Sequence, residues 1–265
     1  MNIAAFDAAA IRAQLEPNHA ATLADILIYD SVTSTNDVLW QRFADNPASP
    51  AVCIAEQQSA GRGRRGGAWQ SPAGGNIYLS LFWPLPTSGN VEGLSIAVGI
   101  SLIHALSAFG VNALKLKWPN DILHQRRKLA GILVEARYGE SYGVVIGIGI
   151  NYIALPAQHL NEIPQPVTNL AEICPQIPDR NSLCGQLINH IMSALKLFQH
   201  QGLTEFLPHW PALDALHEQS IVIKTEQGSL QATACGINEK GELRYMHNQQ
   251  LDTLSSSHVS IRFAS

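Results

Sequence analysis

Two long helices are predicted by the spacing of apolar residues along the chain. Between residues 94 and 109, and again between residues 183 and 198, apolar side chains recur every three or four positions, as they do on one face of a helix. Gly110 follows the first segment at the position of a C-terminal cap. Asp179 or Asn181 can cap the start of the second.

Shorter apolar runs predict further elements. One helix is expected over residues 7–15, ended by Pro17, and another is expected to begin at Ser34 or Thr35, whose hydroxyls suit a helix N-terminus. Strands are predicted over residues 26–29, 51–56, 76–83, 113–117, 129–136 and 143–151. The last run is apolar at alternate and intervening positions alike, so we expect a central strand that is covered on both faces.

The pattern changes after Pro211, where short strands alternate with Glu-Gln-Gly and Glu-Lys-Gly turns. Strands are predicted over residues 217–225, 228–236, 242–246 and 258–263. This stretch of about 50 residues is too short to be stable unless it docks on the rest of the chain or closes into a tight barrel. The sequence therefore predicts a larger mixed α and β part followed by a small all-β module.

Composition excludes several classes of protein. The chain has 265 residues, of which 46% are hydrophobic and 14% charged, and this balance excludes a disordered or fibrous chain. The formal net charge of −4 argues against a globally basic nucleic-acid-binding protein. No apolar run is long enough to span a membrane, and no basic segment followed by an apolar run suggests a signal peptide. We therefore expect a cytoplasmic protein.

The cysteines and histidines do not have metal-ligand spacing. Cys53, Cys174, Cys184 and Cys235 are scattered and form no C-x-x-C pair, so neither a zinc ribbon nor a dithiol redox site is predicted. The histidines show no H-E-x-x-H or similar helical pair.

A glycine- and arginine-rich loop is the clearest chemical signal. No acidic residue occurs between Glu56 and Glu92, yet this window contains Arg62, Arg64 and Arg65 among several glycines. Arginine offers forked donors to a carboxylate or phosphate, and glycine lets the backbone approach a ligand closely. The alternative is a solvated surface turn, but a loop kept charged only for solubility would carry both signs.

The same loop satisfies G-x-G-x-x-G, the dinucleotide-binding pattern, but its context does not. That pattern requires a helix opening at the third glycine and an acidic residue about 20 positions further on. Here Gly67, Pro72, Gly74 and Gly75 prevent the helix. A P-loop is also absent, because no glycine precedes a Lys-Ser or Lys-Thr pair.

Two further segments place polar side chains at strand ends. Lys117-Trp-Pro-Asn-Asp121 predicts a strand end and a turn that Pro119 fixes, presenting Asn120 and Asp121. Lys128-Leu-Ala-Gly131 brings a lysine to the start of the next strand. Each segment alone would be ordinary, and their occurrence together with the arginine loop favours an anion-binding site.

These motifs together resemble the biotin–protein ligases, or biotin–[acetyl-CoA-carboxylase] ligases. The segments that carry the resemblance are Ser34-Thr-Asn36, Gly61-Arg-Gly-Arg-Arg-Gly66 with Trp69, Lys117-Trp-Pro-Asn-Asp121, Lys128-Leu-Ala-Gly-Ile-Leu-Val-Glu135 and Gly147-Ile-Gly-Ile-Asn151. Their order and spacing are similar to those of the family from Asp30 to about Asn151, and the resemblance continues more weakly into the C-terminal module.

The resemblance implies an α+β fold, with a mixed sheet and flanking helices like those of class II aminoacyl-tRNA synthetases and a small C-terminal SH3-like β-barrel. It implies an N-terminal extension over residues 1–29, a catalytic domain over 30–214 and an SH3-like domain over 215–265. Family members activate biotin with ATP to biotinyl-5′-AMP and pass the biotinyl group to one lysine of a carrier domain. ATP, Mg²⁺, biotin and a biotin carboxyl carrier protein are thus the implied co-substrate, ion, substrate and partner.

The resemblance also assigns roles to individual residues. Lys128 and Arg64 are the implied catalytic residues, and Asp121 is the implied Mg²⁺ ligand. The implied biotin site comprises Ser34, Thr35, Asn36, Gln58, Arg62, Gly63, Arg64, Lys128 and Gly131. The implied ATP site comprises Arg62, Arg64, Trp69, Asn120, Lys128, Gly149, Asn151 and Arg262. The other interpretation of the glycines near 149 is a strand that is merely well packed.

Two departures from the family pattern matter. Gly67 and Ala68 precede Trp69 where many members carry further basic residues, so this loop is less cationic. Only 29 residues precede Asp30, with Arg12 as their sole basic residue, so we expect a short form without a winged-helix DNA-binding domain. DNA binding is therefore disfavoured, while a homodimer stays open.

Three other functions stay open from the sequence. A lipoate–protein ligase would share the fold and the adenylation chemistry. A nucleic-acid-binding protein could use the arginine loop together with exposed aromatic residues. A catalytically silent biotin-binding module would release no pyrophosphate when biotin and ATP are added.

Overall fold

The computed structural model describes residues 4–43, 49–86, 90–137, 143–225, 228–256 and 259–264. Its larger part is built on one seven-stranded sheet with the strand order β1-β2-β3-β7-β6-β5-β4. These strands are β1 (Asp25–Tyr29), β2 (Ala51–Ala55), β3 (Ile77–Pro84), β4 (Leu114–Lys117), β5 (Asp121–His124), β6 (Arg127–Arg137) and β7 (Gly143–Ile150). Strands β1 and β2 are parallel and every other neighbouring pair is antiparallel, so the sheet is mixed and the predicted α+β class is confirmed.

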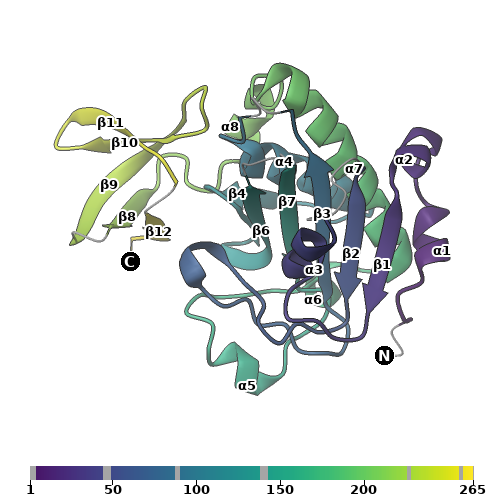
Figure 1. Cartoon of the computed structure of the whole chain (residues 1–265). Coiled ribbons are helices and arrows are strands. Elements are labelled where there is room, and N and C mark those ends of the chain that lie inside the picture. The colour runs from purple at the N-terminus through teal and green to yellow at the C-terminus, as the bar shows by residue number, and fades with distance from the viewer. Residues whose placement is uncertain are drawn as a thin grey trace.

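Strand β7 lies between β3 and β6, and the expectation of a central strand is confirmed. Helices cover both faces of the sheet around it (Figure 1). On one face lie α4 (Leu94–Ala108) and α7 (Arg180–Gln201), which pack on each other. On the other face lies α3 (Thr35–Arg42), over β2, β3 and β7. Coverage on both sides explains why the sequence of β7 is apolar throughout.

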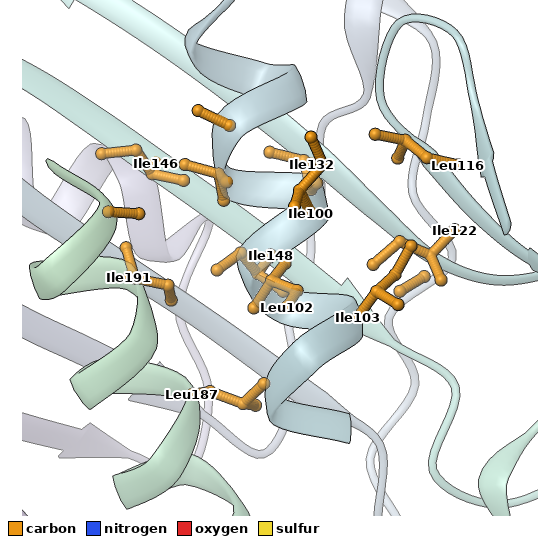
Figure 2. Packing of buried hydrophobic residues seen from close by; sticks show 14 of the residues in the cluster. Ile100, Leu102, Ile103, Leu116, Ile122, Ile132, Ile146, Ile148, Leu187 and Ile191 are labelled. Carbon is orange, nitrogen blue, oxygen red and sulfur yellow. The ribbon is translucent and has the colours of Figure 1, made fainter. Parts of the chain in front are cut away.

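The main core fills the space between α4, α7 and the sheet. Figure 2 shows Ile100 and Leu102 of α4 over Ile132 of β6 and Ile148 of β7, with Leu187 and Ile191 of α7 beside them. A methyl group at Gly99 would lie 2.7 Å from a Leu116 methyl carbon, so a glycine there lets α4 approach the sheet closely. A smaller cluster under α3 is formed by Leu39, Trp40, Phe43, Ala51, Cys53, Phe82 and Val145.

The N-terminal segment packs against α7 and joins the main sheet through β1. It contains α1 (Ala8–Arg12) and α2 (Pro17–Thr22). The side-chain oxygen of Asn181 accepts a hydrogen bond from the backbone of Asp7 at 2.9 Å. The first helix ends at Arg12, before the predicted end at Leu15, so Pro17 does not terminate it. Pro17 instead begins α2, which was not predicted, because proline suits the first turn of a helix.

Between β7 and α7, residues 151–179 form a long connection, which is called the crossing below. Short helices α5 (Ala157–Leu160) and α6 (Leu170–Ile173) lie on this crossing. After α7, a 3₁₀ turn η2 (Leu207–His209) and α8 (Trp210–Leu213) lead to the C-terminal module. The side chain of Asp179 caps α7 by accepting a hydrogen bond from the backbone of Ser182 at 2.9 Å, as its position in the sequence predicts.

The C-terminal module is a five-stranded antiparallel sheet with the order β11-β10-β9-β8-β12. Its strands are β8 (Ser220–Thr225), β9 (Gly228–Ile237), β10 (Leu243–His247), β11 (Gln250–Leu254) and β12 (Ser260–Phe263). Strand β11 was not predicted, because most of its side chains are exposed and no apolar alternation marks it. The expected turn at residues 226–228 lies partly outside the described residues. The closed SH3-like form and the exact domain boundaries stay predictions.

The module docks on the main part beside the β4–β5 hairpin (Figure 1). The indole of Trp118, in the turn of that hairpin, donates to the carbonyl of Gly241 at 2.9 Å. Phe263 of β12 lies near the ammonium of Lys117 and the guanidinium of Arg126, at 5.6 and 4.9 Å from its ring centroid. Within the described ranges, no helix is both long and apolar enough to cross a membrane.

Candidate active site

A cavity of about 510 Å³ lies where the sheet, the arginine loop and the C-terminal module meet. Its wall combines the N-terminus of α3, the loop around residues 58–70, the β4–β5 hairpin, the middle of β6 and β7, the crossing after β7 and strand β12. Every residue that the sequence analysis named for the site lines this cavity: Ser34, Thr35, Asn36, Gln58, Arg62, Gly63, Arg64, Trp69, Asn120, Asp121, Lys128, Gly131, Gly149, Asn151 and Arg262. Residues more than 200 positions apart are thereby brought to one site, although the cavity does not test their individual roles.

One end of the cavity is a set of uncharged polar groups at the start of α3. Ser34, Thr35 and Asn36 are all buried there. Gln58 accepts from the backbone N–H of Thr35 at 2.9 Å through its side-chain oxygen. Ser80 of β3 lies behind them, and its hydroxyl is 2.6 Å from that of Thr35 and 2.5 Å from the amide oxygen of Asn36. Ser80 was missed because nothing in an apolar strand marks one serine as part of a site.

The arginine loop begins with a guanidinium that is fully engaged by carboxylates. Arg62 donates to Asp37 at 2.6 Å and to both oxygens of Glu135 at 3.1 Å. Burial lowers the pKa of Arg62, but the hydrogen bonds and charges of Asp37 and Glu135 outweigh this effect and raise the pKa overall. The side chain predicted to meet phosphate is therefore bound within the protein. Its predicted role at the nucleotide rests on the resemblance alone.

Arg64 lies deeper in the loop, at the start of the 3₁₀ turn η1 (Arg64–Gly66). Its guanidinium donates to the backbone carbonyl of Ser256, which comes from the C-terminal module. Burial lowers the pKa of Arg64, and the negative charge of Asp121 acts in the opposite direction. Arg65 has a φ of 57° and Gly66 a φ of 71°, so the turn reverses the chain through left-handed conformations. The loop thus presents Arg64 between the two parts of the molecule.

Lys128 and Asp121 form an ion pair on the cavity wall. The distance between the lysine Nζ and the Asp121 Oδ1 is 2.6 Å, and each side chain is 14% exposed. The Trp69 ring lies 4.9 Å from the same ammonium. Asn151 donates from its amide to the backbone carbonyl of Lys128 at 3.2 Å. The amide therefore supports the backbone that carries the lysine, whereas the sequence analysis expected it at the nucleotide.

Lys117 is a further cation of the cavity, and the sequence analysis quoted its motif without assigning it a role. It lies opposite Asp121 in the strand register of the β4–β5 hairpin, and it is 6% exposed. Burial lowers the pKa of Lys117 to about 8, against the raising effect of Asp121, and the charges of Arg262 and Lys128 lower it further. Lys128, Lys117 and Arg64 thus all lie within electrostatic range of Asp121, and Arg262 lies within range of Lys117.

The floor of the cavity is a strip of glycines on β6 and β7 that carries the Trp69 ring. A methyl group at Gly149 would lie 2.3 Å from Cε2 of Trp69, and one at Gly131 would lie 2.8 Å from its Cζ3. At Gly147 a methyl group would lie 2.5 Å from the amide oxygen of Asn36. These glycines are required by side chains of the protein packed directly on them, as the well-packed-strand interpretation expects, and their role at a nucleotide stays a prediction.

Asn120 is engaged in the framework of the site. Its side-chain amide donates to the backbone carbonyl of Ile132 at 2.7 Å, which ties the hairpin turn to β6. Gln70, next to Trp69, donates to Glu162 at 2.6 Å and lies 3.1 Å from the ring of His159. The crossing after β7 thereby holds the far end of the arginine loop.

A site for a metal ion has little protein support beyond Asp121. Within the ranges that the structure describes, no three His, Cys, Asp or Glu side chains form a group that could hold a metal ion. A single carboxylate on a cavity wall fits Mg²⁺ that takes its other ligands from phosphate and water, because Mg²⁺ is commonly held in this way.

Comparisons with known proteins give consistent results. Residues 28–151 match the model of the biotin/lipoate A/B protein ligase family. Bifunctional ligase/repressor BirA of Escherichia coli strain K12 is 35% identical over 242 residues, which are 90% of this chain and 74% of that protein. A biotin–[acetyl-CoA-carboxylase] ligase of Mycobacterium tuberculosis is 34% identical over 167 residues, 60% of this chain and 59% of that protein. The structure of biotin protein ligase from Aquifex aeolicus in complex with biotin and ATP is similar with a TM-score of 0.75 and 26% identity, covering 92% of this chain and 99% of that one.

Proposed function

The chain belongs to the biotin/lipoate A/B protein ligase family and is a ligase, and we propose that it activates biotin with ATP and transfers the biotinyl group to a specific lysine of a biotin carboxyl carrier protein. The names of its relatives support biotin as the substrate, and the Aquifex aeolicus structure with biotin and ATP supports the two ligands together. The glycine- and arginine-rich loop and the Lys117–Asp121 motif favour biotin over lipoate.

One observation carries the proposal: four cations converge on a cavity whose far end is uncharged and polar. Arg64, Lys117, Lys128 and Arg262 come from four separate segments, and Asp121 lies among them. The reaction must bring a carboxylate against the α-phosphate of a polyanion. Two unit charges at about 4 Å repel by roughly 4 kcal/mol at an effective dielectric constant of 20. Fixed cations at the junction offset this repulsion.

The chemistry requires no nucleophile from the protein. In the first step a carboxylate oxygen of biotin bonds to the α-phosphorus of ATP, the bond to the β-phosphate oxygen breaks, and pyrophosphate leaves. In the second step the amine of the carrier lysine attacks the acyl carbon, the acyl–phosphate bond breaks, AMP leaves and the amine loses a proton. Catalysis in the first step consists of positioning and of stabilising negative charge.

Each part of the cavity has a task in this reaction. Ser34, Thr35, Asn36 and Gln58 bind the ureido end of biotin, which offers both donors and an acceptor. Arg64 and Lys128 stabilise the carboxylate and then the acyl phosphate, for which guanidinium and ammonium groups are suited.

The nucleotide would lie beside the Trp69 ring, which covers the glycine floor, on the side of the cavity lined by Arg262 of the C-terminal module. Asp121 is the side chain that would hold Mg²⁺, and the ion would neutralise part of the phosphate charge. With Asp121 engaged by the ion, Lys128 would be free to bond the substrate in place of Asp121. Residues 61–70 close over the adenylate and exclude water, because a mixed anhydride hydrolyses readily.

Incorporation of labelled biotin into a carrier domain, with and without ATP, tests the proposal. Label should enter the carrier only when ATP is present, with one pyrophosphate released per biotin activated. A carrier in which the acceptor lysine is replaced by arginine is the control for specificity. Lipoate offered in place of biotin should give no transfer, and preferential transfer of lipoate would refute the assignment of the substrate.

A further inference from the structure

Glu135, near the C-terminal end of β6, binds three side chains from two other parts of the molecule. Its carboxylate accepts from the amide of Asn36 at 2.9 Å and from the indole N–H of Trp40 at 3.2 Å, both on α3. It also accepts from Arg62 at the start of the arginine loop, at 3.1 Å to each oxygen. The side chain is 28% exposed, so the bonds are partly shielded from water. One carboxylate therefore joins the sheet, the helix and the loop.

The charge of Glu135 sets the orientation of Asn36. A carboxylate can only accept hydrogen bonds, so the NH₂ group of Asn36 must face it. The amide oxygen then faces Ser80, whose hydroxyl oxygen lies 2.5 Å away. Gly147 leaves room for this orientation, because any side chain there would overlap the amide oxygen. The amide of Asn36 consequently has one arrangement instead of two.

The same logic continues from Asn36 to Thr35. Ser80 is fully buried and has one hydroxyl proton, which it donates to Asn36. It must then accept at its contact with Thr35, 2.6 Å away, so Thr35 donates its own proton to Ser80 in preference to the amide oxygen of Gln58, which is farther away at 3.1 Å and already accepts from the Thr35 backbone. The Thr35 hydroxyl is left with only lone pairs for the cavity. A ligand must therefore offer an N–H or O–H donor to Thr35.

The chain of bonds also reaches both ends of the arginine loop. Arg62 pairs with Ala68 in an antiparallel bridge, so the bond from Glu135 to Arg62 holds the base of the loop. At the other side Gln58 donates to Ser71 at 2.9 Å, and Ser71 donates to the carbonyl of Trp69 at 2.9 Å. The oxygen of Gln58 accepts from Thr35, which closes the connection. What binds at Thr35 is thus linked to the loop that carries Arg64.

We infer that Glu135 is a positioning residue for biotin recognition: it fixes the Asn36–Ser80–Thr35 hydrogen bonds so that Thr35 accepts from a ureido N–H, and it ties that polar end to the base of the arginine loop through Arg62. The inference rests on the proposed function and deepens it, since the donor selected at Thr35 is a property of the substrate. Glu135 itself acts through Asn36 and Arg62.

Glu135→Gln is the sharpest variant, because it keeps the shape of the side chain while giving it a donor. Arg62 keeps its bond to Asp37, so the loop retains one anchor. The Asn36 amide becomes free to turn over, and the direction of the Ser80 and Thr35 bonds is no longer fixed. The KM for biotin should rise by about ten- to hundredfold, the range for weakening hydrogen bonds to a charged group. The KM for ATP and the kcat at saturating biotin should change by less than about threefold.

Ser80→Ala tests the order of the bonds, because it removes only the hydroxyl between Asn36 and Thr35. Its effect on the KM for biotin should match that of Glu135→Gln in direction. The double variant should be no worse than the more severe single variant, since both break one chain. Asp25→Asn is the matched control. It breaks the exposed ion pair between Asp25 of the edge strand β1 and Arg42 of α3, and it should leave kcat and both KM values unchanged.

The measurements are initial rates of pyrophosphate release with biotin and ATP varied separately, and hydrogen exchange of residues 61–70 in the presence of biotin alone. Protection of the loop by biotin in the parent, and its loss in Glu135→Gln, would support the link through Arg62. An unchanged KM for biotin, a fall in kcat alone, or fully multiplicative effects in the double variant would each overturn the inference. A parent that releases no pyrophosphate with biotin overturns the proposed function and the inference together, whereas an active parent with an unaltered variant overturns only the inference.

Discussion

Replacing Lys128 by alanine should slow the formation of the adenylate by two to three orders of magnitude. The ammonium is the cation nearest to Asp121, at 2.6 Å, and it lines the cavity beside the Trp69 ring. Losing one preorganised donor to a developing negative charge costs on the order of 3 kcal/mol of transition-state stabilisation. This corresponds to a rate that is lower by roughly 150-fold.

The fold should tolerate Lys128→Ala, because Asp121 is not left in a neutral environment. Arg64 and Lys117 both feel the charge of Asp121, and its side chain keeps contact with water. The variant should therefore lose far more activity than stability. A second change separates the two roles that Lys128 has in the structure. If the lysine served only to neutralise Asp121, the double variant Lys128→Ala with Asp121→Asn would recover the rate.

Single-turnover release of pyrophosphate from biotin and ATP, without carrier, measures the step directly. Lys128→Arg serves as the comparison that keeps the charge but changes its geometry, and it should fall between the parent and the alanine variant. A rate within about threefold of the parent for Lys128→Ala would refute the role of the lysine. Recovery in the double variant would refute the claim that it acts on the substrate.

Three further predictions concern the loop, the floor and the buried lysine. Arg64→Gly should weaken retention of the adenylate, so that lysines of unrelated proteins become biotinylated in a mixture; labelling confined to the carrier would contradict this. Gly149→Ala should displace the Trp69 ring from the glycines of β6 and β7, because the added methyl would lie 2.3 Å from the ring. The tryptophan emission should shift and the KM for ATP should rise. An unchanged emission spectrum and an unchanged KM would contradict the packing described. Burial lowers the pKa of Lys117 from 10.5 to about 8, so its positive charge disfavours folding at pH 7. The free energy of unfolding of the parent therefore increases as the pH rises from about 8 to 10.5, where the lysine is neutral in the folded state and still charged in the unfolded state. Lys117→Met should therefore raise the free energy of unfolding at pH 7 by on the order of 1–3 kcal/mol, and this gain should become smaller towards pH 10. Urea unfolding at pH 7 and pH 10 measures both values. A variant that is less stable than the parent at pH 7 would refute the prediction.

Those parts of the fold with a strong local period could be predicted from the sequence. The helices at Leu94–Ala108 and Arg180–Gln201 repeat apolar residues over several turns, and the strand at Gly143–Ile150 is too apolar to face water. Strand β5 was missed because it has four residues and directly follows the turn at Pro119. The order of the strands depends on long-range pairing, which no local pattern contains.

In the candidate site, too, the residues could be predicted from the sequence but their interaction partners could not. The motifs named the residues that line the cavity, because each motif places polar groups at a strand end or in a glycine-rich loop. The partners could not be predicted, since Asp37 and Glu135 look like ordinary helix and strand residues until the fold brings them to Arg62. Asn120 and Asn151 have the residue type of ligand-binding groups, yet they bind backbone carbonyls that hold the hairpin turn and Lys128 in place.

Three cations of the cavity, Arg62, Arg64 and Lys128, are already bound to protein groups, which changes how anion binding should be understood. Lys128 is paired with Asp121, Arg64 with the Ser256 carbonyl, and Arg62 with two carboxylates. Binding of the polyanion must exchange these bonds for new ones, so the net gain is smaller than the sum of the attractions to free charges. The exchange also lets the cations stay close together before substrate arrives, because Asp121 offsets their mutual repulsion. A ligand that brings both a carboxylate and phosphates offers acceptors that can replace Asp121 at Lys128 and the carbonyl at Arg64 together. In the proposed reaction, release of Arg64 from Ser256 would therefore link substrate binding to the position of the C-terminal module.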